Sequence, residues 1–409
     1  MNEQVQDRSQ TRVYGQITEE GLDQLRRRIG VEHRIEQPFL RFANSDSIRH
    51  VARAIGDTNP LWIDPAHAAV GPYGRPVAPP ALLYGVTWGS WDMRRGEGLP
   101  GVHGLHSRDK WTYYLPILDG DEIYATKKLI GLEEKSGSYA GRSIIQTREF
   151  AYFNQREEKV ARCLMSAFRV ERHAGKEGGK YASIEKARYT EAEIQRIDDA
   201  IAAEIVRGDT PRFWEDVNIG ETLQPIVRGP LTVADMIAWM MGIGSPHIRS
   251  GQYWLDYRRQ SPKVAVRDPE SNIFQAVERV HWDPFMAAEI GMPAPYDYGS
   301  QRGAWATHLM TNWAGDAGRV VDVDVQYRGM NFLGDTVWIG GKVLDRWSGQ
   351  QTGIGYVETS IEGITQRGDN IMPGKAIVAL PTRHKALPMT ARIDHEAERP
   401  ATAMPGAGG

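Results

Sequence analysis

The sequence lacks the features that mark several common classes of protein. Its 409 residues include one cysteine, Cys163, so no internal disulfide framework can form and a reducing cytoplasm is expected. No apolar run approaches the ~20 residues that span a bilayer, and residues 1–12 lack the apolar segment of a secretory signal. The net charge of -3 leaves no basic footprint for nucleic acid. We therefore expect a cytoplasmic protein that binds neither membrane nor nucleic acid.

The remaining composition is that of an ordinary globular protein, and its length points to more than one domain. Hydrophobic residues make up 41% and charged residues 25% of the chain, which is typical of soluble domains. Two domains of roughly 150 residues each are the default for this length. The next question is whether the two parts are related to each other.

Two segments with helical character open two similar series of motifs. Residues 45–56 place apolar side chains at 48, 51, 52 and 55, which is the spacing of one helix face. Residues 231–244 are apolar almost all round, as in a helix covered on most sides. Each segment ends in a glycine, Gly56 or Gly244, which is a common helix stop. We expect one long helix per half.

The motifs after these helices recur in the same order, which indicates an internal repeat. Asp64-Pro65 recurs as Asp283-Pro284, residues 118–122 recur as 332–336, and a hairpin turn at 152–156 recurs at 364–368. Gly56 and Gly244 are 188 positions apart, whereas Asp64 and Asp283 are 219 positions apart. The second half therefore carries about 31 extra residues, at roughly 246–277.

Local signals between the halves predict the domain limits. Residues 172–180 are rich in Gly and Lys, and residues 190–193 form a capping box that opens a helix running to about 207. We expect a first domain at 1–175, a linker with a helix at 176–210, a second domain at 211–390 and a flexible tail at 391–409.

Residues 54–65 carry the most informative motif of the chain. Within it, residues 56–60 read Gly-Asp-Thr-Asn-Pro, which resembles the Gly-Asp-x-Asn-Pro signature of the MaoC-like, (R)-specific enoyl-CoA hydratases and dehydratases. The resemblance implies an α+β double hot-dog fold, in which each repeat has a long central helix wrapped by a curved antiparallel sheet. The first half is similar to the dehydratase domain that is often fused ahead of a MaoC-like domain.

The same resemblance assigns roles in the first half. Asp57 matches the catalytic acid or base of the family, and Asn59 matches the residue that orients its loop. Trp62 stands where the family has a catalytic His, and an indole donates one hydrogen bond but accepts none, so it cannot act as a base. We expect Trp62 to line an acyl pocket. His67 is a candidate substitute base.

The second half has the opposite pattern. Residues 278–284 resemble the family's Asn-Pro-Ile-His-x-Asp-Pro, which places His281 at the catalytic position, but Ala276 stands where the Asp should be. Asp256, in the extra residues, could fold back to supply a carboxylate. Asp57 and His281 are thus the predicted catalytic pair. Whether they form one dyad across the halves, or one half has a re-engineered dyad, stays open.

Two Pro-rich turns predict the substrate-binding residues. Residues 74–83 and 291–299 resemble the family's Gly-x-Pro-x-Pro turn, which borders the acyl tunnel. This implies that Pro79 and Tyr296 lie beside the acyl group, and that Tyr298 and Arg302 contact the thioester or the phosphates. Four tryptophans on the helices that follow are expected in the core, or around a bulky acyl group: Trp88, Trp91, Trp305 and Trp313.

Other motifs do not complete a site. His103 and His106 have a spacing seen in zinc sites, but no further Cys, His or carboxylate completes four ligands. No Gly-x-Ser-x-Gly elbow of a serine hydrolase occurs. We therefore expect no bound metal.

The combined patterns predict an acyl-CoA hydratase or dehydratase, a hydro-lyase that adds water to a 2-enoyl-CoA or removes it without a metal or redox cofactor. Two alternatives stay open. One is an acyl-CoA thioesterase, and the other is a non-catalytic acyl-CoA-binding subunit that needs a partner hot-dog chain. Homo-oligomerisation is expected, because hot-dog sheets expose edges and helix faces that usually pair.

Overall fold

The structure is a computed structural model, and it describes residues 15–91, 99, 101–137, 141–171, 181, 184–268 and 270–399. The first half contains α1 (Glu19–Arg26), β1 (Glu32–Arg34), α2 (Ser45–Ile55), α3 (Pro60–Ile63), α4 (Pro65–Val70), α5 (Leu82–Thr87), β2 (His103–Tyr113), β3 (Tyr124–Gly137), β4 (Gly141–Phe153) and β5 (Lys159–Val170). A connecting helix, α7 (Glu191–Ala202), follows.

The second half repeats the helix-then-strand order with more elements before its central helix. It contains η1 (Trp214–Asp216), β6 (Ile226–Arg228), α8 (Val233–Ile243), α9 (Gly251–Gln260), η2 (Pro262–Val264), β7 (Ala265–Arg267), β8 (Phe274–Ala276), η3 (Val277–His281), α10 (Pro284–Glu289), α11 (Gly299–Ala314), β9 (Arg319–Gln326), β10 (Val337–Gly340), β11 (Val343–Ser348), β12 (Gly355–Thr365), β13 (Gly374–Leu380) and η4 (His395–Glu398).

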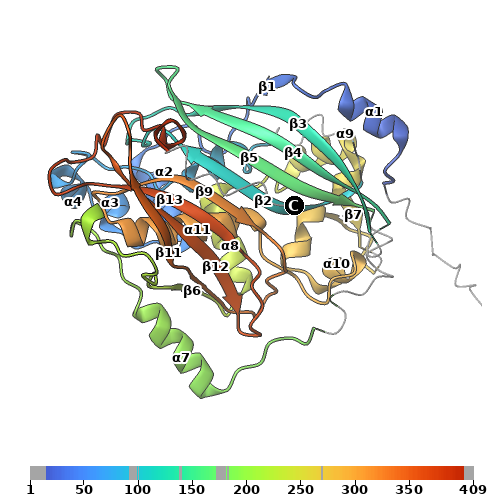
Figure 1. The fold of residues 1–409 in the computed structure, drawn as a ribbon. Coiled ribbons are helices and arrows are strands. Elements are labelled where there is room, and N and C mark those ends of the chain that lie inside the picture. The colour runs from blue at the N-terminus through green and yellow to red at the C-terminus, as the bar shows by residue number, and fades with distance from the viewer. Residues whose placement is uncertain are drawn as a thin grey trace, which may run out of the picture.

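One antiparallel sheet runs through both halves (Figure 1). Its strand order is β1-β3-β4-β5-β2-β9-β13-β12-β10-β6, with β11 paired to β12. The halves join where β2 pairs with β9, in the register Arg108↔Gln326 to Thr112↔Asp322. Because sheet and helices are packed in layers, the predicted α+β class and the double hot-dog architecture are confirmed.

The helix that packs on the sheet in the second half is α11, and not the one expected from the sequence. All but two of its sixteen residues are buried, and it contacts β2, β9, β10 and β13. The expected helices at 45–56 and 231–244 form as α2 and α8, but they pack mainly against each other. Residues 231–244 are therefore not covered on most sides: α2 and α5 pack on one face, while Val233, Ile237 and Met241 are exposed.

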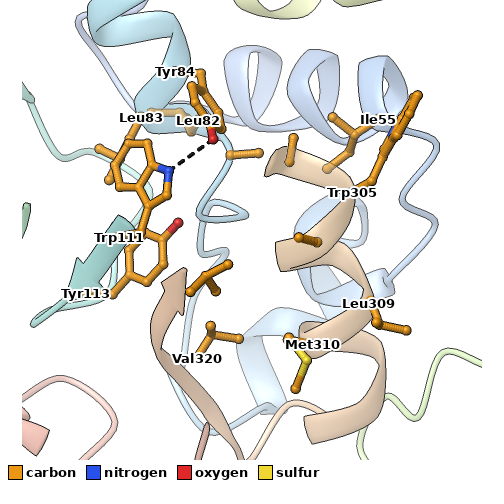
Figure 2. Close-up of a cluster of buried hydrophobic side chains, with 14 of the residues drawn as sticks. Ile55, Leu82, Leu83, Tyr84, Trp111, Tyr113, Trp305, Leu309, Met310 and Val320 are labelled. Carbon is orange, nitrogen blue, oxygen red and sulfur yellow. Dashed lines mark hydrogen bonds between the residues drawn. The ribbon is translucent and has the colours of Figure 1, made fainter. Parts of the chain in front are cut away.

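The two halves share one hydrophobic core, seen in close-up in Figure 2. In this view Tyr84 of α5 and Trp111 of β2 lie on one side of the cluster, and Trp305 and Leu309 of α11 lie on the other. The indole nitrogen of Trp111 donates a hydrogen bond of 3.0 Å to the hydroxyl of Tyr84. Since side chains of both halves fill the same core, the division into two domains stays a prediction.

The repeat predicted from the sequence is present at the level of single hydrogen bonds. In the turn before β3, the Asp121 carboxylate accepts from the backbone N–H of Leu118 at 2.9 Å, and Gly120 has a φ of 94°. In the corresponding turn, Asp335 accepts from the N–H of Phe332 at 3.0 Å, and the equivalent glycine has a φ of 93°. Only a residue without Cβ adopts this backbone at little cost. The two turns are therefore structural equivalents.

The ends and connections differ in part from the expectations. The capping box of Thr190 and Glu193 is present, but its helix ends at Ala202 instead of about 207. Residues 391–399, assigned above to a flexible tail, are packed against the sheet. Ile393 is buried, and its N–H donates to the carbonyl of Tyr114 at 3.0 Å. No helix in the part of the chain that the structure describes is long and apolar enough to cross a bilayer.

Candidate active site

The loop after α2 holds Asp57 in a closed arrangement. Asp57 is 3% exposed, and its carboxylate accepts from the backbone N–H of Asn59 at 3.0 Å and from the indole N–H of Trp62 at 2.9 Å. Asn59 caps α3 by accepting from the N–H of Leu61 at 2.9 Å. Trp62 thus occupies the position of the family's His and binds the carboxylate instead of leaving it open to a ligand.

The surroundings of Asp57 make its carboxylate easier to protonate than one in water. Burial raises the pKa of Asp57 to about 6, although the hydrogen bonds from Asn59 and Trp62 and the charge of Arg228 lower it. His308 of α11 lies 3.5 Å from the carboxylate, but burial and Arg228 lower the pKa of His308 to about 3, so the ring is neutral. The pair is therefore a buried polar cluster and not an ion pair.

The space beside this loop is small. A cavity of about 60 Å³ is lined by Asn59 and Trp62, but Asp57 is not among its lining residues. Pro79 is buried next to it, between the lining residues Ala78 and Pro80. Ligand pockets are usually at least ~300 Å³, so this cavity cannot take an acyl thioester.

A much larger cavity, of about 1320 Å³, lies at the corresponding place in the second half. One wall comes from the first half, where residues 103–107 of β2 line it. Another comes from the extra residues of the second half, including His247 and Tyr257. His281, Tyr296, Tyr298 and Arg302, which the sequence analysis assigns to the site, line this cavity, whereas Asp57, Asn59, Trp62 and Pro79 do not.

His281 is positioned by its neighbours for hydrogen bonding through one ring nitrogen. Its Nδ1 lies 2.7 Å from the backbone carbonyl oxygen of Tyr296, and its ring stacks on Tyr298 with centroids 3.8 Å apart. A carbonyl oxygen only accepts, so Nδ1 carries the proton and Nε2 of the neutral ring is an acceptor. This geometry suits a base that takes a proton at Nε2.

Glu278 supplies the carboxylate that the second half was expected to lack. It is 4% exposed, lines the cavity, and accepts from the hydroxyl of Tyr298 at 2.9 Å. Ser245 also donates to it, because the Ser245 Oγ already accepts from the backbone N–H groups of His247 and Ile248. Both carboxylate oxygens are thus held in place by hydroxyl donors.

A constant offset in the sequence could have identified Glu278. Asp64 and Asp283 cap the two equivalent helices α4 and α10, each accepting two backbone N–H groups. They are 219 positions apart, and the same offset relates Asn59 to Glu278. The spacing of the family motif points to position 276, which is Ala276, whereas the carboxylate lies two residues later. Asp256, the alternative, accepts from Gln252 on α9 and does not line the cavity.

The N-terminus of the central helix borders the same cavity. Gly299, the first residue of α11, is among its lining residues. The first N–H groups of a helix have no intrahelical acceptor, and the helix dipole makes this end favourable for negative charge. The first turn of α11 can therefore donate to an oxygen that gains charge.

The other predicted binding residues are more buried than expected. Arg302 is 4% exposed, donates to the carbonyl of Gly329 at 2.9 Å, and lies 3.2 Å from Asp297. Burial raises the pKa of Asp297 to about 6, against the opposing charge of Arg302. Arg302 therefore ties neighbouring loops together beneath the cavity instead of reaching out to phosphates.

The two remaining histidine candidates fall in different places. The Nε2 of His67 lies 2.7 Å from Asp316, outside the large cavity, so His67 belongs to the packed first-half corner. His103 and His106 both line the cavity. Among the described residues, no group of three or more His, Cys, Asp or Glu could hold a metal ion.

Part of the chain is similar to known sequences. Residues 34–163 match the family described as FAS1-like, dehydratase domain region. The chain is 29% identical over 106 residues to a UPF0336 protein of Streptomyces avermitilis, covering 25% of this chain and 68% of that protein. It is 33% identical over 78 residues to the (R)-specific enoyl-CoA hydratase of Aeromonas caviae, covering 19% of this chain and 55% of the hydratase.

Solved structures resemble the whole double unit. A MaoC-like dehydratase superposes with a TM-score of 0.59 at 18% identity, covering 87% of this chain and 99% of the other. A putative MaoC domain protein dehydratase from Chloroflexus aurantiacus gives a TM-score of 0.55 at 14% identity, covering 87% and 96%. These likenesses show the double hot-dog fold for the chain, and residues 34–163 match the FAS1-like dehydratase domain region.

Proposed function

We propose that the second half adds water to a 2-enoyl-CoA thioester, or removes it from the 3-hydroxyacyl-CoA, with His281 and Glu278 as the catalytic residues. One observation carries this proposal. Glu278 and His281 line the same cavity of about 1320 Å³, at which α11 begins. Asp57, the carboxylate matched by motif, lies outside this cavity.

His281 would move the proton. Its Nε2 accepts a proton from water as the water oxygen bonds to C3 of the enoyl group, and the imidazolium then delivers that proton to C2 as the C2–C3 double bond becomes single. The Tyr296 carbonyl, 2.7 Å from Nδ1, holds the ring orientation and stabilises the imidazolium. The ring is regenerated, and the product is the 3-hydroxyacyl thioester.

Glu278 would orient the attacking water, while α11 stabilises the intermediate charge. Because Tyr298 and Ser245 each donate to it, Glu278 is held as an acceptor that fixes the direction of the water protons. The thioester oxygen gains enolate character during the attack. The N–H groups of the first turn of α11, at Gly299, would donate to this oxygen.

The charge around the cavity suits the phosphates of coenzyme A. Arg28, Lys263 and Arg328 are exposed and line the cavity, so they form a basic rim. The buried part of the cavity is aromatic, with Tyr298 and Tyr327 among its lining residues. We infer that the phosphates bind at the rim and that the acyl group enters the aromatic part.

The proposed reaction needs no metal and no redox cofactor, because the proton added to C2 and the hydroxyl added to C3 both come from one water. We further propose that the first half acts as a wall of the acyl cavity and not as a second active site. Assembly of the chain with itself, or with a partner hot-dog chain, stays a prediction.

The test is hydration of 2-enoyl-CoA esters by the purified chain, followed by the loss of the enoyl thioester absorbance, with free CoA measured by a thiol reagent in parallel. We expect hydration without release of CoA. Release of CoA would identify a thioesterase. Binding of the esters without turnover, relieved by a second hot-dog chain, would identify a binding subunit.

A further inference from the structure

His106 also lines the large cavity, and it comes from the first half. It lies on β2 beside a bulge between His106 and Arg108, and only 10% of its side chain is exposed. It packs against the start of α11, where a Cβ at Gly299 would come within 2.8 Å of the His106 side chain. The absence of a side chain at Gly299 therefore allows His106 to reach the cavity wall.

A buried carboxylate fixes this histidine. The Nε2 of His106 lies 2.6 Å from Asp109, which is fully buried. The hydroxyls of Tyr84 and Tyr327 donate to the other oxygen of Asp109, at 2.6 and 3.0 Å. Burial, followed by the charge of Asp109, raises the pKa of both tyrosines well above its usual value, so both remain donors.

The hydrogen-bond pattern decides which ring nitrogen of His106 carries a proton. Because Asp109 accepts from two tyrosines, it is held as a carboxylate, and Nε2 of His106 must then donate to it. The remaining nitrogen, Nδ1, is buried and has no hydrogen-bond partner among the described residues. A buried polar atom without a partner is rare and calls for an explanation, such as a water or a ligand atom that it binds.

The surroundings of His106 are aromatic and lead back to the reacting centre. Trp88 stacks parallel to its ring with centroids 6.3 Å apart, and Tyr327 meets it edge-on at 5.0 Å. Trp88 in turn lies 6.2 Å from Tyr298, whose ring stacks on His281. His106 and His281 are thus linked through Trp88 and Tyr298 along one aromatic wall of the cavity.

We propose that Nδ1 of His106 binds a hydroxyl group on the acyl part of the substrate, so that the substrates are enoyl-CoA esters hydroxylated beyond the reacting double bond. This rests on the proposed function. A hydroxyl suits His106 in either protonation state, because it can donate to the neutral ring or accept from the protonated ring. A carboxylate or carbonyl could only accept, and a plain alkyl chain would leave Nδ1 buried without a partner.

The test compares terminally hydroxylated 2-enoyl-CoA esters with unsubstituted esters of equal length, over a series of chain lengths. At the length that reaches His106, we expect kcat/KM to be about tenfold higher for the hydroxylated ester, since leaving a buried acceptor unpaired has a cost of this order. His106→Phe should abolish this preference and retain turnover of the unsubstituted ester. A preference absent at every length, or one that survives in His106→Phe, would refute the proposal.

Three controls keep the result interpretable. His106→Gln, which retains a polar group, should keep part of the preference, and it serves if His106→Phe fails to fold. His103→Phe, on the same strand and in the same cavity, should leave the ratio between the two esters unchanged. If no ester is hydrated, the proposed function fails. Calorimetry then tests His106 independently, by the ratio of the Kd values of a saturated hydroxylated acyl-CoA and of the plain acyl-CoA of equal length. A carboxylate-terminated ester that is preferred over the hydroxylated one would overturn the assignment of a hydroxyl.

Discussion

Two loops at equivalent positions share a backbone framework but differ in their chemistry. They are the loop between α2 and α4 and the loop between β8 and α10. In each, an aspartate caps the following short helix, Asp64 in the first half and Asp283 in the second. Two residues before it stands Trp62 or His281. In the first loop the indole closes over a buried carboxylate, and in the second the imidazole faces a cavity of about 1320 Å³.

The difference lies as much in what surrounds each loop as in the residue itself. The first loop packs against the second half, where Arg228 contacts both the carbonyl of Gly56 and the ring of His308. The second loop is opposed by the extra residues around α9 and by the open face of β2. In a protein with two related halves, one site can thus stay open while side chains of the other half fill the equivalent site.

The strongest test of the difference between the two loops is to remove the imidazole of the loop that faces the large cavity. We expect His281→Asn to lower kcat for enoyl-CoA hydration by about 1000-fold, within the usual range for a general base. The enoyl thioester absorbance measures this. His384→Asn, at an exposed position, should have no effect. Equal activity of wild type and His281→Asn would show that the open cavity is not the reaction site.

The two carboxylates give a second test. Glu278→Gln should reduce kcat by about 100-fold. The glutamine amide has an NH2 donor in place of one acceptor oxygen, so it no longer fixes the water solely by accepting hydrogen bonds from it. Asp57→Asn should leave kcat within about twofold, because Asp57 does not line the cavity. A large loss of kcat in Asp57→Asn together with normal activity in Glu278→Gln would reverse the assignment of the two halves.

Placing a histidine at position 62, where the family has one, tests whether the first loop can support the reaction. Trp62→His should not recover activity in a His281→Asn background, because the adjoining cavity is only about 60 Å³. It should lower the free energy of unfolding by about 3 kcal/mol, since a buried indole and its bond to Asp57 are lost. Urea denaturation measures the change. Trp62→Phe, which keeps an aromatic ring, should cost less. A gain of turnover would mean that the first half retains a usable site.

The buried Asp57 also predicts a difference in pH dependence of stability. Its folded pKa, about 6, is above its ordinary value, so its protonation stabilises the fold; this stabilisation is full below pH 4 and is lost as the pH rises through 6. From pH 4 to 7, wild type should therefore lose about 2 to 3 kcal/mol relative to Asp57→Asn. Denaturation curves of both proteins at each pH test this. Parallel pH profiles would mean that Asp57 is not protonated in the fold.

Much of the fold could be predicted because the repeat is carried by short-range patterns. Residues 118–122 and 332–336 share the spacing of a glycine followed by an aspartate, and the two turns have the same hydrogen bonds. The capping box at Thr190 is equally local. The position of α11 on the sheet was not predicted, because its polar residues Gln301, Arg302 and His308 are buried by contacts with distant segments.

The site was predictable only in part, for the same reason. His281 could be found by motif, since its place before Asp283 is fixed along the chain. Glu278 could not be given a role that way, because its partners Ser245 and Tyr298 are 33 and 20 residues away. The interpretation of Asp57 as catalytic followed from its motif alone, and its burial could not be read from neighbours in sequence.

The amino-acid sequence by itself determined that two related units follow each other, where each turns, and which histidine position is filled. These properties depend on residues a few positions apart, whose backbone geometry and hydrogen bonds are set locally. The tertiary structure decided which unit keeps an open cavity and that His106 of the first half lines the same cavity as Glu278 and His281 of the second. Cavities and burial arise from segments far apart in the chain, and no local pattern records which of them meet.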